Sequence, residues 1–162
     1  MRLAGHFEAS HRSPTFSQGG MTAMPAVTRW FIKAGLAYLV AALLLGVALT
    51  APSVLSVPPS IAVWAPLYFH FFMVGWVAQL IFGVVYWMFP RYTRDQPRGS
   101  ETLALATFIL LNAGLILRAV GEPVNSLRPG TIWGWIVALS AVLQWLAGTA
   151  FVCNTWARVK ER

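Results

Sequence analysis

The sequence predicts an all-α integral membrane protein with four transmembrane helices and both termini in the cytoplasm. Its composition is the first reason: of 162 residues, 57% are hydrophobic and only 10% are charged, and the mean hydropathy is +0.63. A soluble domain carries about 25% charged residues, so this chain lacks the charge needed to cover a surface that faces water. We therefore expect a lipid bilayer around most of it.

Four apolar stretches supply the second reason, because each reaches the roughly 20 residues of helix that cross a hydrocarbon core. They cover residues 30–50, 67–89, 102–120 and 132–156. The segments APSVLSVPPS, PRYTRDQPRGS and GEPVNSLRPG separate them, and their Pro and Gly residues are expected to end helices and form turns. The first apolar run is longer than the core of a signal peptide, so it is expected to be retained as a helix.

The chain divides into two parts. Residues 1–25 are polar and unpatterned, which predicts a flexible cytoplasmic N-terminal tail; translation starts at Met1, Met21 or Met24. Residues 26–162 form the predicted four-helix transmembrane domain. Two of the three histidines lie in the tail and are not expected to be ligands.

The basic residues fall almost entirely on one side of the predicted bilayer. One side carries Arg2, Arg12, Arg29, Lys33, Arg91, Arg94, Arg98, Arg158, Lys160 and Arg162; the other carries Arg118 and Arg128. Cytoplasmic loops carry such an excess, so both termini are predicted to be cytoplasmic, in the inner membrane of a bacterium. The net charge of +7 then reflects topology and contact with anionic headgroups. Nucleic-acid binding is not expected.

The second span carries a histidine and a stripe of small and polar residues. At about 100° per residue, His70 lies on one face, and Gly75, Gln79 and Gly83 lie on the opposite face. Such a stripe lets another helix approach closely and offers it an amide. The fourth span repeats the spacing with Ser140, Gln144 and Gly148, which suggests two related helix pairs.

Other polar residues of the spans have simpler interpretations. Asn112 and Asn154 are expected to bond between helices. Glu101 and Glu122 lie at the predicted span edges, so no carboxylate is expected at depth, which disfavours a proton pump.

Placing an ionisable side chain inside a bilayer costs free energy, so such a residue is expected to have a function. His70 nevertheless has two interpretations. In the first, His70 bonds a carbonyl or water near the outer boundary. In the second, it is an axial ligand of a haem iron, which requires an imidazole directed into an apolar slot.

The segment HFFMVGWVAQLIFGVVYWMFPR resembles the second transmembrane helix of subunit I in the haem–copper oxidase superfamily, in the branch that includes nitric oxide reductases. The matching positions are His70, Gly75, Gly83, Tyr86 and Pro90. The resemblance implies that His70 ligates a low-spin b-type haem and lies near the outer side of the membrane.

The resemblance covers this one segment, and family members have many more helices. Their second haem ligand and copper ligands lie on later helices, and no histidine follows His70 here. The chain alone is therefore not expected to be a complete oxidase. A second copy in a homodimer, or a partner membrane subunit, would supply the second haem ligand; otherwise the histidine is a relic.

Haem propionates need cations, and Arg118 and Arg128 are the two basic residues on the side of His70. Either could form a bidentate bond with a propionate. In the alternative, Arg118 reaches lipid headgroups and pairs with Glu122, four residues later.

Three functions remain open at this stage. The first is a haem-binding electron-transfer module with His70 as axial ligand. The alternative is a cofactor-free accessory subunit that packs on a larger respiratory complex through the two small-residue stripes. The third is a channel or transporter in which Gln79 and Gln144 line a polar path.

Overall fold

The computed structural model describes residues 24–50, 59–89 and 99–159, and every regular element in these ranges is a helix. The elements are α1 (Ala26–Thr50), η2 (Pro59–Trp64), α2 (Ala65–Phe69), η3 (His70–Ala78), α3 (Gln79–Met88), α4 (Glu101–Leu127), α5 (Thr131–Thr155) and η4 (Trp156–Arg158). The predicted flexible tail lies outside the described residues, apart from its last two positions.

The described helices form four stretches that are long and apolar enough to cross a membrane: Ala26–Thr50, Ile61–Met88, Glu101–Leu127 and Thr131–Arg158. Their mean hydropathies lie between 1.8 and 2.2. Large apolar side chains such as Leu44, Met88 and Ile132 are exposed on their outward faces, as lipid contact requires. The predicted all-α fold is therefore confirmed for the described residues, with four helices long and apolar enough to span a membrane.

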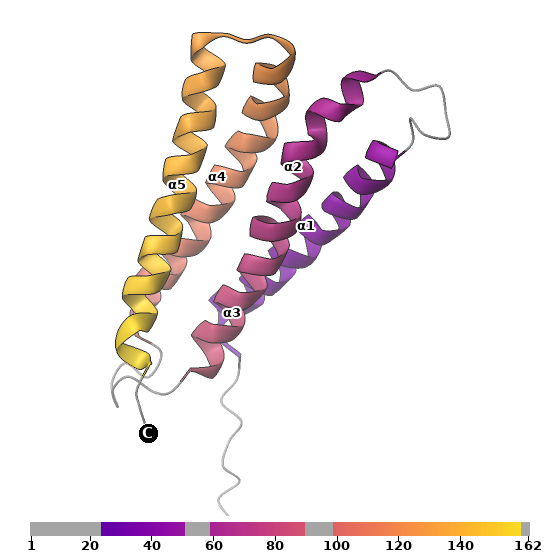
Figure 1. Cartoon of the computed structure of the whole chain (residues 1–162). Helices are drawn as coiled ribbons and strands as arrows, with labels where there is room; N and C mark the ends of the chain where they lie inside the picture. Colours follow the sequence, from indigo (N-terminus) through magenta and orange to yellow (C-terminus); the bar gives the residue numbers. More distant parts are fainter. Residues whose placement is uncertain (1–23, 51–58, 90–98, 160–162) are drawn as a thin grey trace, which may run out of the picture.

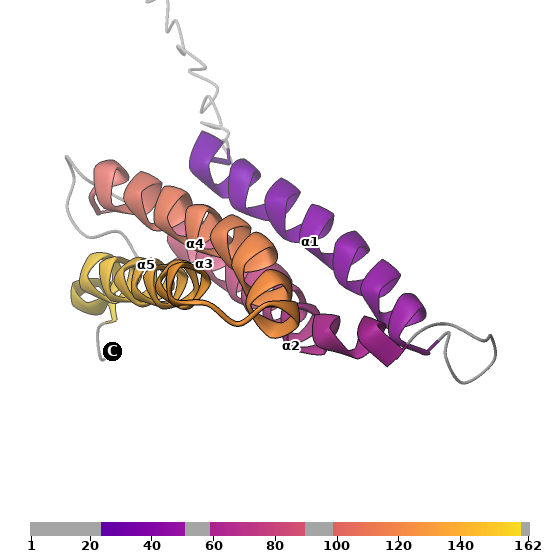
Figure 2. The same ribbon diagram turned by 90° about the horizontal axis from the view of Figure 1, so that it is seen from above.

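The helices associate as two antiparallel pairs, which Figures 1 and 2 show from two directions. Pair A consists of α1 and the second span, the continuous run from η2 to α3; pair B consists of α4 and α5. α1 and α5 lie farthest apart, with the second span and α4 between them (Figure 2). α1 and α4 begin, and α3 ends, at the same end of the bundle (Figure 1). This end is called the N-terminal end.

The third span is longer than predicted, because the segment GEPVNSLRPG does not end the helix at its first glycine. α4 continues through Pro123 to Leu127 and stops only before Pro129. Pro123 removes one backbone donor, but backbone polar groups at membrane depth must be paired internally, and continuing the helix pairs most of them. Glu122, predicted at the edge of a span, consequently lies inside a helix.

The second span is not a uniform α-helix. It begins at Pro59, earlier than predicted, and it takes a π-helical form from His70 to Ala78. On an α-helix, His70 and Gln79 would lie on opposite faces. In the structure both side chains approach α4: Gln79 bonds Asn112 at 3.3 Å, and His70 Nδ1 lies 3.9 Å from Glu122 Oε2. The prediction that His70 lies apart from the packing face is therefore wrong, because α4 packs against the end of the second span that carries it.

The glycines of the second span bring α1 close, as the stripe predicts. A Cβ added at Gly75 would lie 2.7 Å from Tyr38 Cγ, and one at Gly83 would lie 2.9 Å from Phe31 Cβ. Tyr38 and Phe31 both belong to α1, so these two glycines serve packing within the chain. They are not available to a separate subunit.

Pair B has a similar seam around Gly114. A Cβ at this position would meet the Ser140 carbonyl oxygen and the Gln144 Cγ, each at 2.9 Å. Ser140 and Gln144 of the predicted stripe are thus used within the chain. Gly148, its third member, has open space around it, with no atom within 4 Å of an added Cβ.

Alanine substitutions at Gly114 and Gly148 test this difference. Gly114→Ala forces its methyl group against a backbone carbonyl that cannot move independently of α5, and we expect a loss of about 1–3 kcal/mol in the free energy of unfolding. Gly148→Ala meets nothing and should be neutral or stabilising by up to about 1 kcal/mol, because alanine is the better helix former. Reversible unfolding in mixed micelles measures both values, and equal effects would contradict the packing described here.

Candidate functional site

His70 donates a hydrogen bond to the carbonyl oxygen of Pro66, and the distance from its Nδ1 atom is 2.9 Å. A carbonyl can only accept, so Nδ1 carries the ring proton. When the ring carries only this proton, Nε2 holds a free lone pair. The second span therefore fixes both the orientation and the tautomer of this imidazole.

A carboxylate from α4 lies beside the same ring nitrogen. Glu122 Oε2 is 3.9 Å from His70 Nδ1 and 3.8 Å from Arg118 Nε. Both separations exceed hydrogen-bond length, and neither Glu122 Oε2 nor Arg118 Nε has a hydrogen-bond partner although both atoms are buried. These three residues are called the His70 cluster below.

The His70 cluster lies mostly out of solvent. The exposed fractions of its side chains are 29% for His70, 13% for Arg118 and 15% for Glu122. Charges within a span are tolerated when they pair with one another. Here the guanidinium and the carboxylate, four residues apart on α4, balance each other at the point where pair B meets the imidazole of pair A.

Two of the three predicted cofactor-binding residues come together in this cluster. His70 and Arg118 belong to it, and the alternative pairing of Arg118 with Glu122 is present. Arg128 is exposed at the C-terminal cap of α4. No hydrogen bond or ion pair among the described residues joins it to the cluster.

Glu122 is a site residue that the sequence pattern does not predict. Its spacing from Arg118 predicts the ion pair, but its approach to His70 depends on how α4 packs against the second span. One signal was present in the sequence: Glu122 is an acid on the same side of the predicted bilayer as a lone span histidine.

The chemistry open to this arrangement is monodentate ligation through Nε2. Within the described ranges, no group of three or more His, Cys, Asp or Glu side chains could hold a metal ion. A ligating histidine commonly donates its other N–H to a carbonyl or carboxylate, which orients the ring and raises its basicity. Pro66 and Glu122 offer both kinds of acceptor to His70.

A pair of amides joins the two helix pairs in the middle of the bundle. Gln79 Nε2 donates to Asn112 Oδ1 and Asn112 Nδ2 donates to Gln79 Oε1, each at 3.3 Å. Gln79 is fully buried. The expected interhelical bond of Asn112 is confirmed. Gln79 is used in this contact within the chain, so it is not free to line the polar path of the channel alternative.

Two further sets of polar contacts join neighbouring helices at the N-terminal end. Asn154 Nδ2 donates to the Ser100 carbonyl and its Oδ1 accepts from the Ser100 N–H, which confirms its expected interhelical bond. Arg158 is fully buried and donates to the carbonyl oxygens of Tyr86 and Phe89. A cation at these last carbonyls of α3 complements the negative end of the helix dipole.

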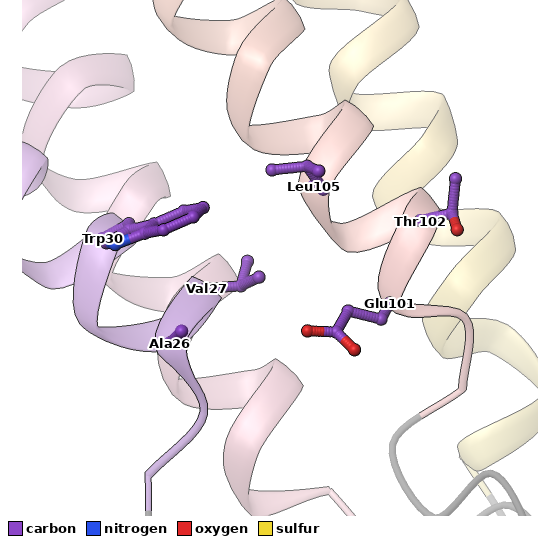
Figure 3. A pocket seen from close by; sticks show the side chains of 6 residues that line it. All are labelled: Ala26, Val27, Trp30, Glu101, Thr102 and Leu105. Carbon is purple, nitrogen blue, oxygen red and sulfur yellow. The ribbon is translucent and has the colours of Figure 1, made fainter.

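The surface of the described structure includes an apolar groove and a smaller pocket with a carboxylate. The groove, of about 470 Å³, lies between α1, the start of the second span and α4; it includes Phe71 but not His70. The pocket, of about 300 Å³, lies at the N-terminal end, between α1 and α4, and includes Trp30 and Glu101 (Figure 3).

Comparison of the chain with models of known families, with curated proteins and with solved structures gives no match. The resemblance to the second helix of haem–copper oxidase subunit I therefore stays a prediction from the quoted segment.

A double-mutant cycle measures the strength of the central amide pair. Gln79→Leu and Asn112→Leu each remove both hydrogen bonds, so their effects on the free energy of unfolding should couple by about 0.5–1.5 kcal/mol. Gln79→Leu combined with Thr149→Val is the control, because Thr149 is exposed on α5 and bonds only to the Trp145 carbonyl. Coupling no larger than in the control would show that the amides do not hold the pairs together.

Proposed function

We propose that this chain is a membrane electron-transfer module that binds a b-type haem, with His70 as an axial ligand. The observation that carries the proposal is the hydrogen bond from His70 Nδ1 to the Pro66 carbonyl at 2.9 Å. It leaves Nε2 as the basic nitrogen of an imidazole held within a membrane span. Histidines that ligate metals are typically held by such a bond.

The surroundings of His70 suit a flat apolar macrocycle. The imidazole keeps 29% of its surface exposed, so Nε2 can meet a ligand without unfolding of the span. Phe69 and Met73, next to it along the helix, are exposed apolar side chains. The π-helical segment that begins at His70 also favours this interpretation, because π-helical turns are frequent at functional sites.

Glu122 has a positioning role in this proposal. Its carboxylate lies 3.9 Å from His70 Nδ1 and adds negative potential on the side of the ring opposite Nε2. Arg118 Nε forms an ion pair with the same oxygen atom at 3.8 Å. We assign Arg118 to Glu122 for this reason, and Arg128, which has no such partner, is the cation left for a propionate.

A bound haem supplies one-electron redox chemistry at its iron. This chain supplies one span imidazole, so the second axial ligand comes from another copy across a twofold interface or from a partner membrane subunit. In this proposal the N-terminal end faces the cytoplasm of a bacterial cell, as the ten-to-two distribution of basic residues favours.

A cofactor-free accessory subunit is the second candidate, and the open position at Gly148 favours it. Nothing lies within 4 Å of a Cβ added there; α5 exposes Trp135 and Trp145, and η4 exposes Trp156. A partner helix could approach this face closely. The other glycines of the predicted stripes already pack against helices of the same chain. Fewer stripe positions are therefore free to contact a partner subunit than the sequence predicts.

Absorption spectra of the detergent-purified chain test the haem proposal. We expect a Soret band and, after reduction with dithionite, a sharp α-band of b-type haem, at one haem per chain or one per two chains. His70→Ala should abolish both bands, since Nε2 is the ligand. His11→Ala is the matched control and should leave the spectrum unchanged.

A colourless protein, even when haem is supplied during expression, would overturn the proposal and favour the accessory subunit. Haem retained by His70→Ala at the wild-type level would assign the ligand elsewhere.

Glu122→Gln tests the positioning role separately. Removal of a negative charge near the ligand destabilises the oxidised iron, so the midpoint potential should rise by roughly 30–60 mV, a three- to tenfold change in the redox equilibrium at 59 mV per tenfold for one electron. Glu101→Gln, at the other end of α4, should leave the potential unchanged. Potentiometric titration followed at the α-band measures both variants, and equal potentials would exclude an effect of Glu122 on the iron.

A further inference from the structure

The pocket at the N-terminal end combines an acid, an indole and apolar walls. It has a volume of about 300 Å³ and is lined by Ala26, Val27, Trp30, Glu101, Thr102 and Leu105. Figure 3 shows the Glu101 carboxylate reaching from α4 toward the first turn of α1. The two helix pairs meet at this pocket without closing it.

The carboxylate of Glu101 has no partner among the described residues. The side chain is exposed, and no hydrogen bond or ion pair reaches it. As the first residue of α4, it lies where the helix dipole stabilises a negative charge. Glu101 is the only charged residue that lines the pocket, in a chain with a net charge of +7.

Trp30 gives the pocket an aromatic wall. Its side chain is 47% exposed, yet its ring contacts Phe108 with centroids 6.1 Å apart, which limits its rotation. The face of an indole attracts a cation within about 6 Å. Val27 and Leu105 supply apolar surface beside it.

A carboxylate, an indole and an apolar wall together recognise an ammonium group on an amphiphilic molecule. The carboxylate provides charge complementarity, and the indole favours an organic cation over a small hydrated ion. The pocket lies where α1 and α4 both begin, which is the depth at which lipid headgroups meet a spanning helix. The surrounding bilayer is therefore the source of the ligand.

We propose that this pocket binds the ammonium headgroup of an aminophospholipid, phosphatidylethanolamine, between Glu101 and Trp30. The same carboxylate repels an anionic headgroup such as that of phosphatidylglycerol. The bound lipid would fill the opening between pair A and pair B at the N-terminal end. The inference is independent of haem, because the pocket shares no residue with the His70 cluster.

Native mass spectrometry of the purified chain with one lipid at a time tests the inference. The probes are phosphatidylethanolamine and phosphatidylglycerol with identical acyl chains. We expect the wild-type chain to prefer phosphatidylethanolamine by about fivefold, which corresponds to a weak charge pair plus a cation–π contact. Glu101→Gln should reduce the preference to twofold or less, and Trp30→Leu should weaken binding of phosphatidylethanolamine.

Two further variants keep the test decisive. Trp135→Leu removes an exposed indole of α5, far from the pocket, and should retain the full preference. Trp30→Phe keeps an aromatic face and should bind better than Trp30→Leu, which separates a cation–π contact from simple loss of bulk. Circular dichroism verifies the helical fold of each variant.

The inference is overturned if the wild-type chain shows no preference for the ammonium lipid. It is also overturned if Glu101→Gln keeps the wild-type preference, or if Trp135→Leu loses it as fully as Trp30→Leu does.

Discussion

The union of two helix pairs inside a bilayer is the constraint on which the rest of this structure depends. Apolar side chains gain little by exchanging lipid for another helix, so association relies on close packing and polar contacts. Within each pair, glycines supply the close packing. Between the pairs, polar contacts occur at three levels: Arg158 on the last carbonyls of α3, Gln79 with Asn112, and His70 beside Glu122. The proposed functional site is thus also one of the places where polar side chains connect pair A to pair B.

The π-helical segment lies between two of these contacts. It begins at His70 and ends one residue before Gln79. With ordinary α-helical turns between them, one of the two would face α4 and the other would face away. In this segment both lie toward pair B, while Gly75 packs against Tyr38 of α1. The same segment therefore connects the packing of pair A to the position of the imidazole.

The sequence predicts the features that depend on local pattern, and it fails where two distant segments must meet. Hydropathy predicts the four spans, and the spacing of Gly75 and Gly83 predicts a close helix contact. The α-helical wheel misplaces His70 relative to Gln79, because nothing in the local pattern specifies how α4 packs against the second span. The inward-facing roles of Glu122 and Arg158 were missed for a related reason: a charged residue near a span end looks like a topology signal until its partner on another helix is known.

The competition for the His70 ring proton bears on the proposed ligand. Nδ1 carries one proton and has two acceptors nearby, the Pro66 carbonyl at 2.9 Å and Glu122 Oε2 at 3.9 Å. In this arrangement the carbonyl accepts the hydrogen bond from Nδ1, and in a closer approach of the two helix pairs the carboxylate would accept it instead. In both cases the proton stays on Nδ1, and Nε2 keeps its lone pair. Movement between the pairs would therefore alter the basicity of the imidazole without removing the lone pair that the proposed ligation requires, which couples the packing of the bundle to the electronic character of the proposed ligand.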